Sequence, residues 1–230
     1  MRAADVAWAI GRPTLGTLAR LASRLKVYGK ERVPREGGIV VACNHFSWLD
    51  PATLGAASPR TLYYMAKVEA HSVPGLGAVL RSFGCFPVRR GESDREAVRT
   101  MRRIVHDGLA LGLFVEGTRQ QSGVPGTVQP GAAMVAIQES VPVVPVAVHG
   151  SQTWRPGNFH PVSIAWGEPL TFDGLPRGGR GYKEASAVLE AEIRRLWDWL
   201  VEMHALDRPA GTPPGGRGLV RASEIHEASG

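Results

Sequence analysis

The sequence has 230 residues, of which 43% are hydrophobic, so it can bury one sizeable core or at most two small ones. The net charge of +6 and the isoelectric point near 9.8 favour an anionic partner, but charge alone does not choose among nucleic acid, an anionic membrane and a phosphorylated small molecule. Two cysteines, Cys43 and Cys85, exclude a disulfide framework and a CxxC metal clip, and we expect buried, reduced thiols in a cytosolic compartment.

The first 26 residues predict an amphipathic helix. They lack the apolar length of a signal peptide or of a bilayer-spanning segment, so we expect neither. Two interpretations are equally supported: the helix lies on a membrane surface, or it packs on the core of its own domain. Its apolar positions are Val6, Trp8, Ile10, Leu15, Leu18, Ala22 and Leu25, and its basic positions on the opposite side are Arg12, Arg20, Arg24 and Lys26.

From residue 27 to residue 205, short apolar runs alternate with helical patterns. This alternation predicts a single α/β domain with a mixed, mostly parallel sheet flanked by helices. The expected strands are Gly38–Cys43, Thr61–Ala66, Phe83–Val88, Leu111–Val115, Val143–Val148 and Val162–Trp166.

Two long helices are expected within this domain. Ser93 and Glu96 form a capping-box pattern that starts the first, and Gly108 marks its end. The second should run from about Tyr182 to Met203. The stretch "PAGTPPGGR" that follows cannot offset the entropy of ordering, so residues 206–230 are expected to form a disordered tail.

The stretch "NHFSWLDP" places a histidine, His45, at the end of an apolar run and an aspartate, Asp50, five positions later. Asp50 precedes Pro51, which suits a helix N-cap followed by proline at the first helical position. Residues 46–49 can then form a turn that folds the carboxylate back onto the imidazole. Such a pair makes a general base, although Asp50 acting only as a cap and His45 only as a polar strand end are the alternatives for an isolated pair.

Two further strand ends carry arginine. "GCFPVRR" ends in Arg89 and Arg90, and "LFVEGTR" ends in Arg119. A guanidinium presents a planar fork of donors that suits a phosphate, and Gly117 and Thr118 add a flexible backbone and a hydroxyl. Each arginine alone is more typical of a solvated strand end. Together with the histidine they indicate a base beside an anion-binding clamp.

With these residues in place, the chain resembles the glycerolipid acyltransferases typified by 1-acylglycerol-3-phosphate (lysophosphatidic acid) acyltransferase. The resemblance covers about Val33 to Glu168 and includes four blocks in a fixed order. One departure is Val115, which stands where the third block usually has proline. The blocks are N-H-x-S-x-x-D at 44–50, a glycine and apolar residues leading to arginine at 84–90, F-P-E-G-T-R at 114–119, and V-P-[VI]-x-P-V at 141–146.

The resemblance implies an acyltransferase domain over residues 27–205. It would move a fatty acyl group from acyl-CoA or acyl carrier protein to a lysophospholipid hydroxyl, most directly that of 1-acyl-sn-glycerol-3-phosphate, with no cofactor or metal. Ornithine lipids and glycolipids are alternative acceptors. We expect a peripheral protein on the cytoplasmic face of the membrane that does not bind nucleic acid.

The same resemblance implies a role for each site residue. His45 would take the hydroxyl proton, and Asp50 would stabilise the imidazolium. Arg90 and Arg119 would hold the acceptor phosphate, while Glu116 would hydrogen-bond the glycerol backbone or brace the arginines. Gly117 and Thr118 complete the expected substrate-binding set. The secondary candidates are Asn44, which could stabilise the oxyanion, Ser47, Lys67 and Arg89.

Rival classes of protein fit the sequence less well. It contains neither the G-x-S-x-G of a serine hydrolase nor the G-x-x-x-x-G-K-[ST] of a nucleotide-binding loop. Cys43 fits better as packing beneath the site than as a thiol nucleophile. A metal site from Cys43, His45, His71 and Cys85 lacks the usual ligand spacing. A basic membrane-binding or nucleic-acid-binding module would leave the histidine and aspartate without a role.

Overall fold

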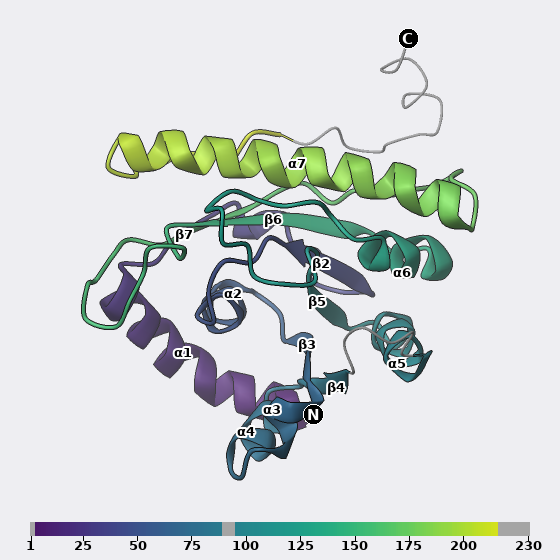
Figure 1. Cartoon of the computed structure of the whole chain (residues 1–230), viewed down its shortest axis with the longest axis horizontal. Coiled ribbons are helices and arrows are strands. Elements are labelled where there is room, and N and C mark those ends of the chain that lie inside the picture. The colour runs from purple at the N-terminus through teal and green to yellow at the C-terminus, as the bar shows by residue number, and fades with distance from the viewer. Residues whose placement is uncertain (1–2, 89–94, 216–230) are drawn as a thin grey trace.

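The computed structural model describes residues 3–88 and 95–215. Figure 1 shows a central sheet with the long helix α7 on one side and helices α1 and α2 on the other. The helices are α1 Ala3–Ser23, η1 Lys30–Arg32 (a 3-10 helix), α2 Asp50–Ala57, α3 Val68–Ser72, α4 Leu76–Ser82, α5 Arg95–His106, α6 Gly131–Glu139 and α7 Gly179–Ala205. The strands are β1 Lys26–Tyr28, β2 Ile39–Cys43, β3 Leu62–Lys67, β4 Phe86–Val88, β5 Ala110–Phe114, β6 Val143–His149 and β7 Ser163–Trp166.

The seven strands form one sheet in the order β1-β7-β6-β2-β5-β3-β4. Strands β6 and β7 are antiparallel, and every other neighbouring pair in the described residues is parallel. The prediction of a mixed, mostly parallel sheet is therefore confirmed. Because β2 and β5 are parallel neighbours, their carboxyl ends, Cys43 and Phe114, meet at the same edge of the sheet.

The central strand β2 is buried on both faces, as expected of a parallel strand covered by helices. Val40 and Ala42 pack in a core with residues of α5, α6 and α7. Ile39, Val41 and Cys43 face the opposite core, which includes Trp8 of α1 and Leu54 of α2. The side-chain period of two thus divides the interior into two layers of apolar contacts.

Helix α1 packs on its own domain. The Trp8 side chain is 3% exposed, and its indole N–H donates to the Phe83 carbonyl at 3.0 Å. A Cβ at Gly55 would lie 2.0 Å from the Trp8 ring, so α2 needs glycine there. The opposite side of α1 is also apolar, and the exposed residues there are Val6, Ile10, Leu18 and Leu21. Within the described residues, no helix combines the length and apolar character that a bilayer span requires.

The helix ends earlier than predicted, at Ser23. Arg24 has a positive φ of 44°, and Lys26 begins the short strand β1, which was not predicted. Lys26 thus lies in the sheet and not on the polar side of the helix. A three-residue edge strand leaves too short an apolar pattern to be read from the sequence.

The predicted strand Phe83–Val88 is wrong over its first half. Residues up to Ser82 form α4, and only Phe86–Val88 is a strand. The reason lies in the C-terminus of α4: Gly84 has φ +81°, and the Cys85 N–H donates to the Leu80 carbonyl at 2.9 Å. These are the features of a glycine-terminated helix, so Phe83–Cys85 close the helix instead of extending the strand.

The two long helices form where they were expected. In α5, the buried residues are Ala97, Met101, Ile104 and Val105, and Gly108 follows the helix with φ +75°. Ser93 lies outside the described residues. Helix α7 extends the predicted Tyr182–Met203 at both ends, and its fully buried apolar residues are Ala185, Leu189, Ile193, Leu196 and Leu200. The helices α3, α4 and α6 were not predicted.

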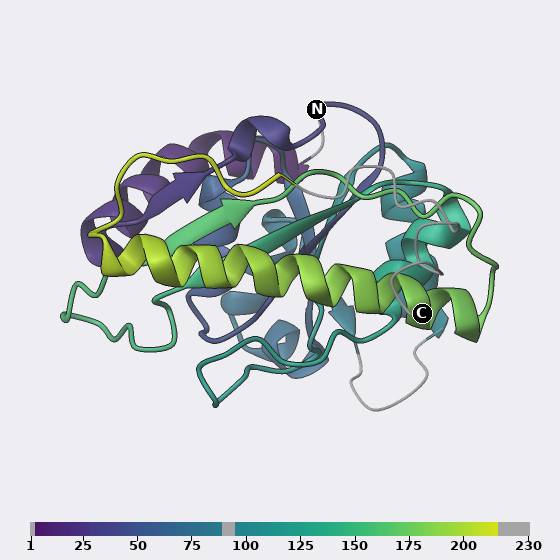
Figure 2. The same cartoon turned by 90° about the horizontal axis from the view of Figure 1, so that it is seen from above.

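The prediction of a disordered tail from residue 206 is wrong for residues 206–215. After α7 the chain turns back and runs beside β1 (Figure 2), where the Lys26 ammonium contacts the Arg208 carbonyl. The Tyr28 hydroxyl donates to the Pro209 carbonyl at 3.1 Å, and the Arg32 guanidinium donates to the Pro213 carbonyl at 2.6 Å. Side chains of the folded domain thus donate hydrogen bonds to the carbonyls of this segment. Its prolines have no N–H groups that could pair with those carbonyls.

Two half-buried histidines join α7 to the end of β6. The His149 and His204 rings meet edge to face at 4.5 Å, and His204 Nε2 lies 2.9 Å from Ser163 Oγ. Burial lowers the pKa of His149 from 6.5 to about 4. Burial, followed by the charges of His149, Arg208 and His160, lowers the pKa of His204 from 6.5 to about 3.

These shifts predict acid-sensitive stability. Below pH 6.5 the unfolded chain binds protons at both positions while the folded chain does not, so the free energy of unfolding should be highest above pH 6.5. It should fall as the pH drops toward about 4, the folded-state pKa of His149. Chemical denaturation of His149→Gln/His204→Gln between pH 4 and 7.5 should give a flatter profile. The exposed His106→Gln is the control, and equal profiles for all three proteins would contradict the assignment.

Candidate active site

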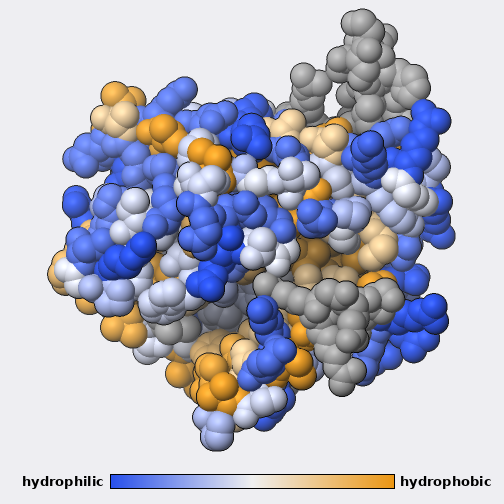
Figure 3. Space-filling view, in the orientation of Figure 1, coloured by the Kyte–Doolittle hydropathy of each residue, from blue (hydrophilic) through white to orange (hydrophobic). Residues whose placement is uncertain are grey.

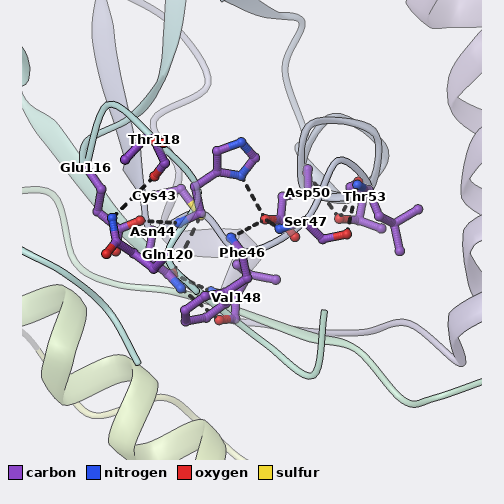
Figure 4. Close-up of polar contacts among 12 residues, drawn as sticks. Cys43, Asn44, Phe46, Ser47, Asp50, Thr53, Glu116, Thr118, Gln120 and Val148 are labelled. Carbon is purple, nitrogen blue, oxygen red and sulfur yellow. Dashed lines mark hydrogen bonds and ion pairs between the residues drawn. The ribbon is translucent and has the colours of Figure 1, made fainter. Parts of the chain in front are cut away.

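Asn44, the first residue after β2, is fixed by the neighbouring strand. Its side-chain N–H donates to the Val148 carbonyl at 3.0 Å, and its side-chain oxygen accepts from the Val148 N–H at 2.8 Å. The carboxamide thus extends the pairing of β2 with β6 by one step (Figure 4). Both ends of the amide thus bind the backbone of β6, which fixes the residue directly before His45, and its role as an oxyanion donor stays a prediction.

The predicted contact between His45 and Asp50 is confirmed. His45 Nδ1 lies 2.9 Å from Asp50 Oδ2, and the main-chain N–H groups of Phe46 and Ser47 donate to the same oxygen at 2.7 Å each. The Ser47 hydroxyl accepts from the Leu49 N–H at 3.2 Å. Residues 46–49 therefore form the expected turn, and the carboxylate holds both the turn and the ring (Figure 4).

The prediction that Asp50 is the N-cap of α2 is wrong. It is the first residue of the helix, after Leu49 in the N-cap position, and Pro51 is the second. The side chain turns back toward residues 45–47 and not forward to the free N–H groups of the helix. It is 1% exposed, and its Oδ1 has no hydrogen-bond partner within the described part of the chain. The contacts of the carboxylate thus converge on Oδ2.

The His45 ring is oriented from two sides. Asp50 engages Nδ1, and the Phe114 ring stacks on the imidazole with centroids 4.1 Å apart and planes inclined by 25°. The His45 carbonyl accepts from the Gln120 N–H at 2.8 Å. With Nδ1 engaged by a carboxylate, the tautomer that protonates Nδ1 leaves Nε2 as the basic nitrogen.

Glu116 acts on the backbone of this site. One carboxylate oxygen accepts from the His45 N–H at 2.8 Å, and the other accepts from the Gly126 N–H at 2.7 Å. Burial raises the pKa of Glu116, and these two N–H donors oppose that rise. Both oxygens therefore join the loop after β5 to the strand end that carries His45, which gives Glu116 a positioning role, and the predicted contact with glycerol or the arginines stays a prediction.

The remaining residues of the third block lie at the surface. Gly117, Thr118 and Arg119 are exposed, and Gly117 has φ +71°, which turns the chain after Glu116. Arg119 directly precedes Gln120, whose N–H binds the His45 carbonyl. The loop thus brings a solvated guanidinium to the same edge of the sheet as the base.

The other predicted arginines cannot be placed in this way. Arg89 and Arg90 lie outside the described residues, and β4 ends just before them at Val88. Lys67, the last residue of β3, is exposed. Since β3 is parallel to both β4 and β5, its carboxyl end points to the edge where the site lies.

Cys43 lies beneath the site as predicted. It is buried, and burial raises the pKa of its thiol well above the ordinary value, which keeps it neutral. Among the described residues no group of three or more histidines, cysteines or carboxylates is arranged to hold a metal ion.

Comparison with known proteins assigns this chain to a family. A family model described as Acyltransferase matches residues 24–149. The 1-acyl-sn-glycerol-3-phosphate acyltransferase of Bacillus subtilis (strain 168) is 32% identical over 190 residues, which cover 79% of this chain and 91% of that protein. The chain belongs to the acyltransferase family.

Two further acyltransferases are similar to this chain. The lyso-ornithine lipid O-acyltransferase of Pseudomonas aeruginosa is 32% identical over 148 residues, 63% of this chain and 56% of that protein. The crystal structure of the 1-acyl-sn-glycerophosphate (LPA) acyltransferase, PlsC, from Thermotoga maritima has the same fold, with a TM-score of 0.69 and 23% identity over 91% of this chain and 83% of that one.

This acyltransferase differs from the usual third block at Val115, and the structure shows what the difference allows. The Val115 N–H donates to the Cys43 carbonyl at 3.0 Å, a bond that a proline cannot make. It extends the pairing of β5 with β2 past Phe114. Sequence analysis also missed the Phe114 ring, the Gln120 N–H and the Gly126 N–H as parts of the site. The first two lie in or beside the third block, whereas no pattern signals Gly126.

Proposed function

We propose that this acyltransferase transfers a fatty acyl group from acyl-CoA or acyl carrier protein to the free hydroxyl of 1-acyl-sn-glycerol-3-phosphate, giving phosphatidic acid. The observation that carries the proposal is the carboxylate-oriented imidazole: His45 Nδ1 lies 2.9 Å from Asp50 Oδ2 at the edge of the sheet. The activity in the printed name of the Bacillus subtilis relative supports the choice of acceptor.

The residues suit direct transfer without an acyl-enzyme. His45 Nε2 takes the proton of the acceptor hydroxyl as its oxygen attacks the thioester carbonyl, and Asp50 stabilises the imidazolium. The C–S bond breaks when the tetrahedral intermediate collapses, and the departing thiolate receives the proton from the imidazolium. His45, Phe114 and Glu116 are held before substrate arrives, so part of the rate comes from orientation.

An acceptor screen tests this function. Purified protein should release free thiol from a long-chain acyl-CoA or acyl carrier protein much faster when 1-acyl-sn-glycerol-3-phosphate is present, because the hydroxyl is the nucleophile. Thiol release with Ellman's reagent and phosphatidic acid by mass spectrometry are the two readouts. Equal release without acceptor would instead indicate a thioesterase, and a preference for lyso-ornithine lipid would move the acceptor to a different lipid class.

Arg119 should recognise the acceptor phosphate. Arg119→Ala removes a charge-assisted contact, so KM for 1-acyl-sn-glycerol-3-phosphate should rise by about one order of magnitude or more, with a much smaller change for the dephosphorylated monoacylglycerol. Steady-state kinetics on both acceptors give the comparison, and the exposed Arg177→Ala is a matched control. Equal losses on the two acceptors would exclude a phosphate contact.

We further propose that the enzyme works at the cytoplasmic face of the membrane as a peripheral protein. Exposed apolar side chains on α1 and along α3–α4 support this, because a lipid surface would remove them from water. Figure 3 shows the hydrophobic surface over α3 and α4 at the bottom of the view. The exposed apolar residues in these two regions are Val6, Ile10, Leu18 and Leu21, and Val73, Leu76 and Val79.

A further inference from the structure

Residues 115–130, all within the described part of the chain, connect β5 to α6 without a helix or strand of their own. The outer part of this loop is exposed and carries Arg119, the residue proposed to bind the acceptor phosphate. A connection of this length keeps one shape only if other parts of the protein fix it. The contacts that fix its second half come from α7, a helix that carries no residue of the site described above.

Residues 125–129 form the return limb of this loop, which leads back toward α6. Glu190 of α7 accepts a hydrogen bond from the Val128 N–H at 2.9 Å, and Arg194 donates to the Pro125 carbonyl at 3.2 Å. The two α7 side chains lie one helical turn apart, with Arg194 Nη2 3.8 Å from Glu190 Oε1. Helix α7 thus binds both a donor and an acceptor on the main chain of the return limb.

The return limb is also bound to the site. The Gly126 N–H donates to one oxygen of Glu116 at 2.7 Å, and the other oxygen accepts from the His45 N–H at 2.8 Å. The Gln120 N–H donates to the His45 carbonyl at 2.8 Å. Hydrogen bonds therefore connect α7 to the main chain of His45 through the return limb and Glu116. Arg119 lies between Glu116 and Gln120, the two loop residues that are attached to His45.

The return limb packs against Gln120 as well. A Cβ added at Gly126 would lie 2.7 Å from Cδ of the Gln120 side chain, so the two residues are in close contact. Gly126 thus touches both Glu116 and Gln120, the attachments on either side of Arg119. Displacement of the return limb would therefore move the guanidinium relative to the imidazole.

We propose that Glu190 and Arg194 are positioning residues for acyl transfer. They hold the return limb and so keep Arg119 where it can bind the phosphate of an acceptor whose hydroxyl lies at His45. The proposal rests on the proposed function, because it concerns the placement of the phosphate contact. Both residues act through main-chain groups of the loop.

Amide hydrogen exchange tests this clamp without any acceptor. In Glu190→Ala/Arg194→Ala, the Gly126 N–H should exchange at least about tenfold faster than in the wild type, because two hydrogen bonds of the return limb are lost. The matched control is Glu184→Ala/Arg180→Ala, which removes a pair of the same residue types from an earlier part of α7. It should leave the exchange of Gly126 unchanged. Unchanged exchange in Glu190→Ala/Arg194→Ala would overturn the proposal.

Steady-state kinetics test the consequence for the acceptor. Glu190→Ala/Arg194→Ala should raise KM for 1-acyl-sn-glycerol-3-phosphate about fivefold or more and change kcat and KM for monoacylglycerol less than about twofold, because Arg119 contacts only the phosphate. Equal KM changes on both acceptors, or a fall in kcat alone, would show a merely structural role. In an Arg119→Ala background the same two substitutions should add less than about twofold. Additive losses would overturn the route through Arg119.

Glu190→Gln provides the conservative comparison. It keeps an oxygen that accepts from the Val128 N–H and loses the ion pair with Arg194, which is partly exposed and contributes little. Its KM and its Gly126 exchange should stay within about twofold of the wild type. Losses as large as those of Glu190→Ala would overturn the hydrogen-bond clamp. If the wild type does not acylate 1-acyl-sn-glycerol-3-phosphate, the proposed function fails, whereas the exchange rates still decide whether α7 holds the return limb.

Discussion

His45→Ala is expected to lower kcat for acyl transfer by about two to four orders of magnitude while leaving acceptor affinity nearly unchanged. The substitution removes the proposed proton acceptor, but the proposed phosphate contact of Arg119 does not depend on the imidazole, and we expect the domain to keep its fold. Acyl transfer kinetics with equilibrium binding of 1-acyl-sn-glycerol-3-phosphate to the same variant separate the two effects.

The exposed His106→Ala provides the matched control, since it removes the same ring far from the carboxyl ends of β2 and β5. It should retain wild-type turnover. If the His45 variant also retains wild-type turnover, the imidazole is not the base. A comparable loss of acceptor affinity would instead show that the ring belongs to the binding site.

Asp50→Asn is expected to lower kcat by about one to three orders of magnitude, a smaller loss than that of His45→Ala. The amide oxygen can still accept from the N–H groups of Phe46 and Ser47, which now donate to the carboxylate at 2.7 Å, so the turn should persist. What is lost is the negative charge opposite the imidazolium. Kinetics and urea denaturation should therefore show lower activity with little change in the free energy of unfolding.

Asp50→Ala separates structural support from chemical support. It leaves two buried N–H groups without an acceptor, at about 1–3 kcal/mol each, so the free energy of unfolding should fall well below that of Asp50→Asn. Denaturation of the two variants under identical conditions makes the comparison. Equal stability of Asp50→Ala and the wild type would mean that the carboxylate does not hold the turn.

The contact between His45 and Asp50 could be predicted from sequence because its determinants are local. His45 and Asp50 are five residues apart, and Pro51 restricts the backbone of the residue before it. The sheet could also be predicted, because each buried strand leaves its own apolar run. The ends of the helices and strands were harder to predict. Lys26 and Phe83 each lie where helical and extended patterns meet, and the positive φ angles of Arg24 and Gly84 decide where each helix ends.

The roles of Glu116 and Asn44 could not be predicted in the same way. Glu116 binds the N–H of a residue 71 positions away, and Asn44 binds a strand 104 positions away. A motif shows that such residues are present but not whether they face substrate or backbone. Only the parallel pairing of β2 with β5 and β6 brings these partners together, and it gives both side chains positioning contacts that the motif alone does not show.

The segment 206–215 has a consequence for the solubility of the protein. Strand β1 is an outer strand of the sheet, and an uncovered outer strand offers a template on which another chain can add. The returning segment lies beside it and is fixed through the carbonyls of Arg208, Pro209 and Pro213. Because prolines have no N–H to donate, the segment covers the edge without becoming a new strand. We therefore expect the segment to protect the sheet from edge-to-edge aggregation.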